Sequence, residues 1–199
     1  MTEARHQPQV LTAHLPHLPP FSGPEHTRQD TGELSDMLRE LRDVLAGRPA
    51  PRDGRVFVFA PEELRRRRPL AFVGFRGTRR AYVPPDVEAA VEQADAALVA
   101  RMGQFPELLS YSCRPLGTGP LGTGDWINLV VLSDAAAVAR WHRDPLHRQA
   151  SEQLSPLFYA HVRLHGGVLP GGVAGPLQTT HTNYYDFSDA QLWIARRHF

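Results

Sequence analysis

The chain has 199 residues, of which 42% are hydrophobic, and this is enough to form one buried core with some extensions. Its formal charge of +1 is the difference between 22 basic and 21 acidic residues, so bulk charge does not indicate a nucleic-acid or anionic-membrane partner. All of the basic residues are arginine. The absence of lysine excludes enzymes that need a lysine Schiff base and nucleotide-binding proteins that need a phosphate-loop lysine.

The single cysteine, Cys113, cannot form an intramolecular disulfide, which fits a reducing compartment. We expect it to be a buried structural thiol in a strand. Prolines and histidines interrupt the first 20 residues where a secretory signal would need an apolar stretch, and no apolar run reaches membrane-spanning length. We therefore expect a cytoplasmic protein with no membrane or nucleic-acid partner.

The first part of the chain is expected to be an extension of the main domain. Residues 1–32 mix proline, histidine, glutamine and glycine without periodicity, which is typical of a flexible arm. In the segment 33–69, apolar residues at helical spacing predict a helix over residues 34–45, ended by Gly47. A short strand is expected at residues 56–59. The apolar stripe of the helix must pack either on this subunit or on a partner.

Arginines are concentrated in residues 48–80, which contain ten of them against Asp53, Glu62 and Glu63. One interpretation is a binding patch for phosphate or another acidic ligand. The other is a solvated helical turn with acidic residues at its start and the run of arginines 65–68 at its end, as the helix dipole favours. We favour the second interpretation.

The central region, residues 70–169, carries the most regular pattern. Strands are predicted at 71–75, 108–115, 126–132 and 157–169, with helices at 85–103 and, in two segments, at 135–154. This β-α-β-β-α-β order predicts an α+β domain of the ferredoxin-like type. The glycine-rich repeat in residues 116–125 predicts a hairpin tip. The extension 170–199 is expected to add a strand at 179–187 and a short capped helix through Trp193.

Alternation along the strands sorts their side chains onto two faces. In the fourth strand, Tyr159, His161, Arg163 and His165 oppose an apolar set of residues. The third strand has Trp126, Asn128 and Val130 on one side and Ile127, Leu129 and Val131 on the other. The second strand has Ser110, Ser112 and Arg114 on one side and Leu109, Tyr111 and Cys113 on the other. Because helices cover one face of such a sheet, we expect the polar and aromatic sets to share the other face.

Two subunits that pair these polar faces would enclose a space suited to a small molecule. The candidate catalytic residues around it are Trp126, Asn128, Tyr159, His161 and Arg163, with His165 as a ligand-binding residue. The alternative is a non-catalytic dimer in which these groups satisfy one another at the interface. An open cavity would favour ligand binding, and mutual pairing of the side chains would favour the structural alternative.

The stretch Trp-Ile-Asn-Leu-Val-Val-Leu-Ser-Asp at 126–134, followed by Trp-His-Arg-Asp-Pro-Leu-His at 141–147, resembles the antibiotic-biosynthesis monooxygenase group of dimeric α+β barrels. The resemblance covers about half of the chain. It implies a homodimer and, in the oxygenase members, cofactor-free oxygenation of an aromatic or hydrophobic molecule held by Asn128, Trp126, Tyr159 and Arg163.

Other members of that group degrade haem, and for such an activity Trp141 and His147 are the candidate ligand-contacting residues. Haem is the less favoured expectation, because the spacing between this tryptophan and this histidine is wider in the haem-degrading pattern. No other cofactor and no metal ion are expected. Whether the protein is an enzyme stays open at this point, with a monooxygenase-like oxidoreductase as the candidate class.

Overall fold

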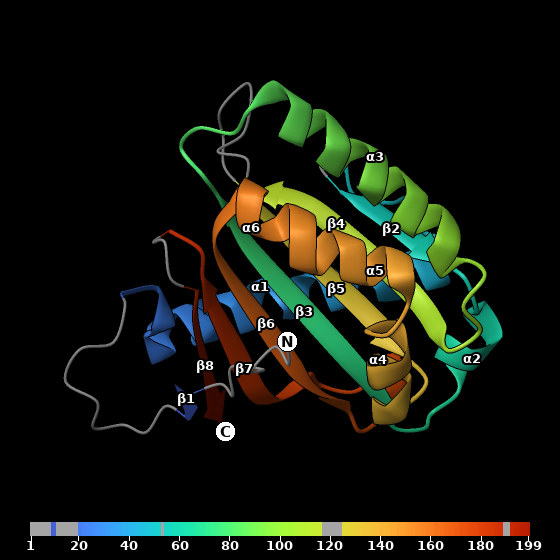
Figure 1. Ribbon diagram of the computed structural model, residues 1–199. Helices are drawn as coiled ribbons and strands as arrows, with labels where there is room; N and C mark the ends of the chain where they lie inside the picture. Colours follow the sequence, from blue (N-terminus) through green and yellow to red (C-terminus); the bar gives the residue numbers. More distant parts are fainter. Residues whose placement is uncertain (1–8, 11–19, 53, 117–124, 189–191) are drawn as a thin grey trace.

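The computed structural model describes residues 9–10, 20–52, 54–116, 125–188 and 192–199 (Figure 1). An eight-stranded sheet with the order β1-β8-β7-β6-β3-β5-β4-β2 runs through the molecule. Neighbouring strands are antiparallel except for the parallel pair β1 and β8 at one edge. The strands are β1 (Gln9–Val10), β2 (Arg55–Val58), β3 (Leu70–Arg79), β4 (Leu108–Leu116), β5 (Asp125–Leu132), β6 (Tyr159–Leu169), β7 (Gln178–Asp186) and β8 (Trp193–His198).

Helices lie on both faces of this sheet. They are η1 (Pro20–Ser22), α1 (Pro24–Leu45), α2 (Pro61–Arg65), α3 (Pro85–Met102), α4 (Ala135–Trp141), α5 (Pro145–Gln149), η2 (Ala150–Leu154), α6 (Ser155–Phe158) and η3 (Gly172–Ala174). In Figure 1, α3 to α6 lie in front of the sheet and α1 lies behind it, so we name the two sides the α3 face and the α1 face. Among the described residues, no helix has both the length and the apolar character needed to cross a membrane.

The central elements follow the predicted order. The strands β6, β3, β5 and β4 are neighbours in that order, and α3 and the α4–α6 segment connect them, an arrangement compatible with a ferredoxin-like fold. The helical segment was expected to end at Ser155 and Pro156, but it continues to Phe158. Proline is tolerated there because it lies in the first turn of α6, where its missing N–H is not needed. Most of the glycine-rich repeat, residues 117–124, lies outside the described residues.

Helix α1 begins at Pro24, ten residues before the predicted start at Leu34. Its buried side chains recur at helical spacing along its whole length: Thr27, Asp30, Leu34, Met37, Leu38 and Leu41. The first two are polar, so the apolar pattern alone marks only the second half of the helix. That half packs against Phe72, Ile127 and Leu129 of the same subunit.

Both faces of β5 are therefore covered, and this corrects the predicted assignment of its sides. Ile127, Leu129 and Val131 pack under α1, although they were expected to face the other helices. Val130 and its alternating neighbours Trp126 and Asn128 face α3 instead. When a strand is buried on both sides, apolar character no longer distinguishes the two sides. Cys113 is 2% exposed in the core on the α3 face, as expected of a structural thiol.

The predicted final helix does not extend through Trp193. Trp193 begins β8, which pairs with β7 over the register Asp186 to His181. A strand there pairs with the backbone N–H and C=O groups that β7 would otherwise expose at the edge of the sheet. The intervening residues 189–191 lie outside the described residues.

The arginine run forms the end of a short helical turn, as we favoured. Helix α2 begins at Pro61, and Arg65 lies 2.6 Å from Glu62. Arg66 and Arg68 both pair with Glu63, at 2.7 and 3.0 Å. Three of the four arginines in the run are thus paired with acidic residues of α2, which fits the solvated-turn interpretation.

Candidate functional site

The predicted site residues separate onto the two faces of the sheet. On β6, Arg163 is paired in register with Arg76 of β3, and His165 with Gly74. Gly74 lies directly under Leu34 of α1, since a Cβ added to this glycine would meet the leucine methyl groups. His161, Arg163 and His165 therefore share the α1 face.

Tyr159 lies on the opposite face, although strict alternation places it with His161. A shift in register between Thr78 and Arg79 of β3 breaks the alternation, and the Tyr159 ring packs edge-on against Phe75 at 5.3 Å. Burial raises the pKa of the Tyr159 hydroxyl well above its ordinary value. Tyr159, Trp126 and Asn128 thus share the α3 face and do not meet the β6 histidines.

Trp141 and His147 belong to the helical layer on the α3 face. Trp141 is 6% exposed and packs edge-on against Phe105. The His147 ring lies between Trp141 and His142, with centroid distances of 5.3 and 5.0 Å. Burial lowers the pKa of His147 to about 4. This pair is therefore remote from His161, Arg163 and His165.

A buried ionic network joins α1 to β6 and β7. Arg163 donates two hydrogen bonds to the Asp30 carboxylate, from Nε to Oδ2 at 2.5 Å and from Nη2 to Oδ1 at 3.0 Å. His165 Nε2 lies 3.0 Å from Asp30 Oδ2, and its Nδ1 lies 2.9 Å from the Thr182 hydroxyl. Asp30, His165 and Thr182 are 0% exposed and Arg163 is 6% exposed. Three ionisable groups are therefore held in one fixed arrangement.

The carboxylate of Asp30 is held in its charged form by its partners. Burial alone would raise its pKa, but the hydrogen bonds from His165 and Arg163 outweigh this effect and bring the pKa below its ordinary value of 3.8. A neighbouring hydrogen bond of 3.0 Å joins Thr27 Oγ1 to the Tyr184 hydroxyl. The first half of α1 is thus attached to the sheet by polar contacts.

A cleft of about 580 Å³ opens on the α1 face beside this network. It lies between the start of α1 and the strands β3, β6 and β7, and its lining combines cationic, aromatic and hydroxyl groups. The lining residues are Phe21, His26, Gln29, Arg76, Thr78, His161, Arg163, Asp186 and Ser188. Of the predicted site residues, His161 and Arg163 are the two that reach this cleft.

Arg76 supplies hydrogen-bond donors at the cleft. Its side chain is 16% exposed, and its Nη2 makes a long contact of 3.3 Å with Asp125 Oδ2. Its Nε is buried and has no hydrogen-bond partner among the described residues. A buried donor without a partner is costly, and the guanidinium that carries it lines the cleft, where an anionic group would find a cationic partner.

His161 forms an aromatic wall of the same cleft. Its ring stacks on Phe21 with a centroid distance of 4.4 Å and an interplanar angle of 15°. Trp193 packs edge-on against the other side of Phe21 at 5.9 Å. The His161 Nδ1 lies 3.2 Å from Asp186 Oδ1, without the alignment of a full hydrogen bond. The wall therefore offers both a stacking surface and a histidine beside a carboxylate.

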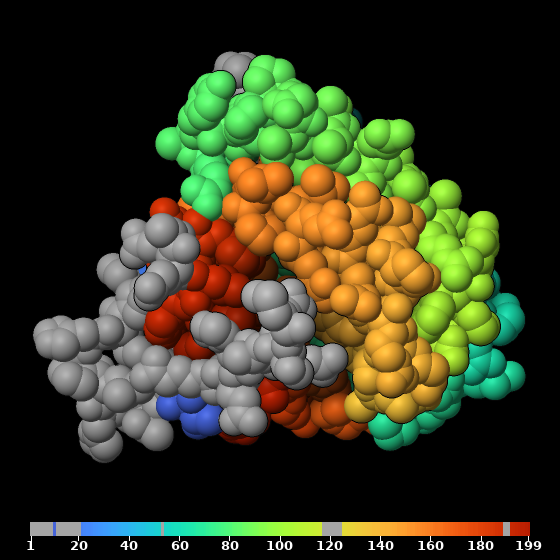
Figure 2. Space-filling view, viewed as in Figure 1, coloured from blue at the N-terminus to red at the C-terminus, as the bar shows by residue number. Residues whose placement is uncertain are grey.

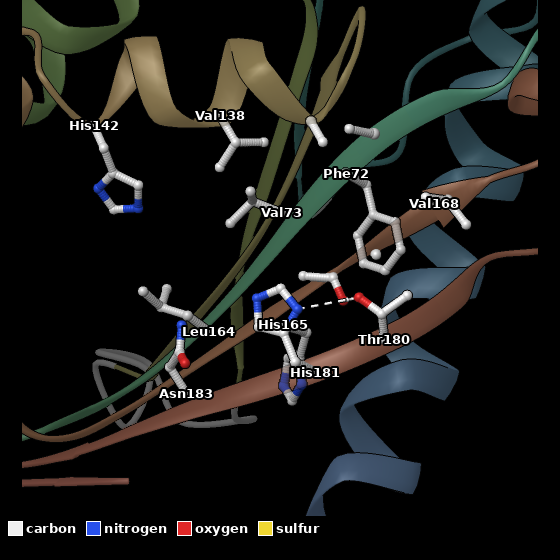
Figure 3. Close-up of a pocket in the computed structure, with 14 residues that line it drawn as sticks. Phe72, Val73, Val138, His142, Leu164, His165, Val168, Thr180, His181 and Asn183 are labelled. Carbon is white, nitrogen blue, oxygen red and sulfur yellow. Dashed lines mark hydrogen bonds between the residues drawn. The ribbon is translucent and has the colours of Figure 1, made fainter. Parts of the chain in front are cut away.

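A second hollow lies on the α3 face, between α4 and the strands β6 and β7 (Figure 3). Figure 2 shows this face of the molecule, where the atoms of α3 (green) and of the α5–α6 segment (orange) cover the sheet. Its volume is about 190 Å³, and its lining includes the apolar side chains of Val73, Val138 and Leu164. His142 and His181 lie on opposite sides of it, and burial lowers the pKa of both. Among the described residues, the lining of this groove contains histidines but no aspartate, glutamate or arginine, so the cleft on the α1 face is the better candidate site.

Sequence reasoning missed Asp30, Arg76 and Asp186 as site residues. Asp30 was detectable, because it precedes Leu34 by four residues on the same helical face. Arg76 was grouped with the arginines of the solvated turn, although strand alternation places it on a face with Phe72 and Gly74. Nothing in the local sequence signals that Asp186 adjoins His161, because this depends on the pairing of β6 with β7.

Within the described ranges, no group of three or more histidine, cysteine, aspartate or glutamate side chains is arranged to hold a metal ion. Comparison of the chain with models of protein families, with curated proteins and with solved structures finds no match. The conclusions about function therefore depend on the geometry of the cleft.

Proposed function

We propose that this protein binds a small molecule with an anionic group and a planar apolar part in the cleft on the α1 face. The observation that carries the proposal is Arg76, whose guanidinium lines the cleft and whose buried Nε lacks a partner among the described residues. Within the described residues Arg76 has one carboxylate partner, Asp125 at 3.3 Å, and an anion in the cleft would add further charge-assisted hydrogen bonds to the same guanidinium.

The size and composition of the cleft support this proposal. Ligand pockets commonly have volumes of about 300–1,000 Å³, and this cleft has about 580 Å³. The stacked rings of Phe21 and His161 form one wall, which suits a planar or aromatic ligand. Such a ligand would place its ring on this wall and its charge at Arg76.

The buried network supports a binding role in a second way. Charges buried away from water are expensive, and they contribute less to stability than a well-packed apolar cluster of the same volume. Asp30 holds Arg163 and His165 rigidly, so Arg163 is positioned at the cleft before a ligand arrives. Mutual pairing explains Arg163 and His165, but it leaves the open cleft and the Arg76 donor unexplained.

The resemblance to the antibiotic-biosynthesis monooxygenase group implies three further properties: cofactor-free oxygenation, a homodimeric barrel and, less favoured, haem binding. Oxygenation of an aromatic molecule without a cofactor requires a stabilised substrate anion, and Arg76 would be suited to stabilise one. A homodimeric barrel is not required for the cleft. Helix α1 already covers the face that the barrel would use, so pairing two such faces would displace it. Haem ligation by His147 is the weaker alternative, because His147 lies on the other side of the sheet.

Ligand-observed NMR with phenylpyruvate, an aromatic keto acid, tests the proposal. We expect saturable binding to the full chain, and we expect Arg76→Gln to weaken it about tenfold or more, which corresponds to about 1.4 kcal/mol or more. Phenylacetone, which lacks the carboxylate, should bind weakly to both proteins.

Arg39→Gln is the matched control, because Arg39 lies on α1 with an exposed side chain paired to Asp36 at 2.9 Å. Binding to this variant should equal binding to the unmodified chain. Equal affinity of the Arg76→Gln variant and the unmodified chain would contradict the proposed site. Failure of phenylpyruvate to saturate at millimolar concentration would contradict the proposed ligand class.

A further inference from the structure

We infer that His161 and Asp186 form a general acid–base pair that removes a proton from a carbon next to the carbonyl group of a ligand held in this cleft. This inference rests on the proposed function, because the ligand must first bind beside Arg76. It assigns a reaction class, the enolisation of an aromatic keto acid, to a site for which only binding is proposed above.

The sheet fixes the two groups beside each other. His161 of β6 and Asp186 of β7 are direct partners in the antiparallel register, so both side chains project from the same face. The Asp186 carboxylate accepts hydrogen bonds from the Ser188 amide at 2.8 Å and from the Ser188 hydroxyl at 2.5 Å. These bonds hold the carboxylate oxygen Oδ1 at 3.2 Å from His161 Nδ1.

The contact between His161 and Asp186 is close but not yet aligned as a hydrogen bond. Such contacts in a site without its ligand often tighten when the ligand binds, so the geometry is compatible with a working pair. With its proton on Nδ1 directed at Asp186, the imidazole presents Nε2 as the basic atom. No hydrogen bond to this Nε2 occurs among the described residues, and His161 lines the cleft.

Arg76 lies on the strand next to His161 and on the same face of the sheet, close enough to hold the ligand while His161 acts on it. Thr78 is the direct register partner of His161, and Arg76 precedes it by two residues on the same face of β3. Arg76 and His161 are therefore diagonal neighbours, about 7–8 Å apart at the backbone. This spacing lets Arg76 hold a carboxylate while a carbon two bonds away lies near the histidine.

The proposed step balances without an oxidant or a reductant. His161 Nε2 takes a proton from the carbon next to the carbonyl, and the electron pair of that C–H bond forms the carbon–carbon double bond of an enolate. The carbonyl π electrons move to oxygen, where Arg76 stabilises the charge. The Asp186 carboxylate stabilises the imidazolium, which then returns a proton to the carbon or to the oxygen.

The simpler explanation is that His161 only packs against Phe21. Stacking would account for the ring plane, since the two rings are 4.4 Å apart. It does not account for a carboxylate in register with the histidine or for an arginine diagonal to it. The two explanations differ in one measurable respect, because packing alone predicts no proton transfer.

Deuterium exchange at the methylene carbon of phenylpyruvate, followed by proton NMR in D₂O, measures this transfer. We expect the full chain to accelerate exchange above the buffer rate. His161→Gln should reduce the protein-dependent rate about 100-fold or more. Because His161 is also part of the stacking wall, the two rates are compared at saturating phenylpyruvate, so that a loss of affinity does not contribute to the difference. His161→Asn should behave in the same way.

His181→Gln is the matched control, because His181 lies on the neighbouring strand and lines the groove on the opposite face. Its exchange rate should equal that of the unmodified chain. Asp186→Asn tests the positioning role of the carboxylate: the exchange rate should fall about tenfold or more while affinity is retained, since this residue acts through the histidine.

The outcomes separate the two proposals. If phenylpyruvate binds and Arg76→Gln weakens binding, but the protein does not accelerate exchange, the acid–base pair is overturned and the binding site stands. If exchange is accelerated equally by the unmodified chain and by both His161 variants, His161 is not the base. If phenylpyruvate does not bind, the proposed function is contradicted, and the acid–base pair, which depends on that binding, is overturned with it.

Discussion

The two halves of helix α1 are attached to the same sheet by different chemistry. The second half buries Leu34, Met37, Leu38 and Leu41, each 0–1% exposed, against apolar side chains of β3 and β5. The first half buries Thr27 and Asp30 against polar groups of β6 and β7. An apolar interface tolerates moderate changes of shape, whereas a buried polar network depends on every one of its partners. The polar half is also the half that borders the cleft.

Asp30→Asn should have the largest effect on stability. It removes the charge that compensates the buried Arg163 and leaves its two donated hydrogen bonds without an ionised acceptor. We expect the free energy of unfolding to fall by about 3–5 kcal/mol. In the apolar half, Leu41→Ala should cost about 2–5 kcal/mol through loss of buried methyl groups. Urea-induced unfolding measures both.

Asp36→Asn is the control for the charge change, because Asp36 lies on the exposed side of the same helix. Its effect should stay below about 1 kcal/mol. A second variant replaces Asp30, Arg163 and His165 together by apolar residues of similar volume, and its stability should approach that of the unmodified chain. The contrast between the two halves of α1 would be contradicted if Asp30→Asn were no more harmful than Asp36→Asn.

Acidification should lower the free energy of unfolding through the polar half of α1, by less than Asp30→Asn does. Burial opposes ionisation of Asp30, but His165 and Arg163 together hold its pKa below the ordinary value of 3.8. Its ionised form therefore contributes stability above about pH 3.8, and this contribution is lost as the pH falls through the folded-state pKa.

The corresponding measurement is the difference in unfolding free energy between the unmodified chain and Asp30→Asn as a function of pH. This difference should be constant near neutral pH and should shrink below about pH 3.8, by about 1.4 kcal/mol for each unit that separates the two pKa values. Asp134 and Asp144, whose pKa values are also lowered, contribute equally to both proteins. A difference independent of pH would mean that Asp30 does not titrate with folding.

Tyr184→Phe should have a smaller effect on stability than either Asp30→Asn or Leu41→Ala. It removes the hydrogen bond of 3.0 Å to Thr27 and leaves that buried hydroxyl without this partner. We expect a loss of about 1 kcal/mol, measured by thermal unfolding. Adding Thr27→Val should recover most of the loss, because both polar groups are then gone. Additive losses in the double variant would show that the two hydroxyls do not stabilise each other.

Much of the central domain could be predicted from the sequence. The segments between residues 70 and 169 have clear periodicity and clear stops, such as Asp134, whose carboxylate accepts the Ala137 amide at the start of α4. The burial of Cys113 also followed from alternation in its strand. These features are local, so a single sequence contains the information that sets them.

The site could be predicted only in part, because its assembly depends on contacts between distant segments. Alternation correctly grouped His161, Arg163 and His165, but a register shift between β3 and β6, which leaves Ala160 unpaired, places Tyr159 on the other face. The sides of β5 were assigned the wrong way round, since the sequence does not reveal that α1 covers the second face. Asp30 contributes a polar group to an otherwise apolar helical stripe, and apolar periodicity overlooks such a residue.

Gly74 has a consequence for how this site is able to change. A Cβ atom at this position would lie 2.3 Å from a methyl group of Leu34, so glycine lets α1 approach β3 closely in the middle of the sheet. Because α1 is one continuous helix, a side chain at residue 74 would push the helix outward at Leu34 and tilt its first turns, which border the cleft. We therefore expect substitutions at residue 74 to change the width of the cleft although this residue does not line it, and so to change the size of ligand that the proposed site would accept.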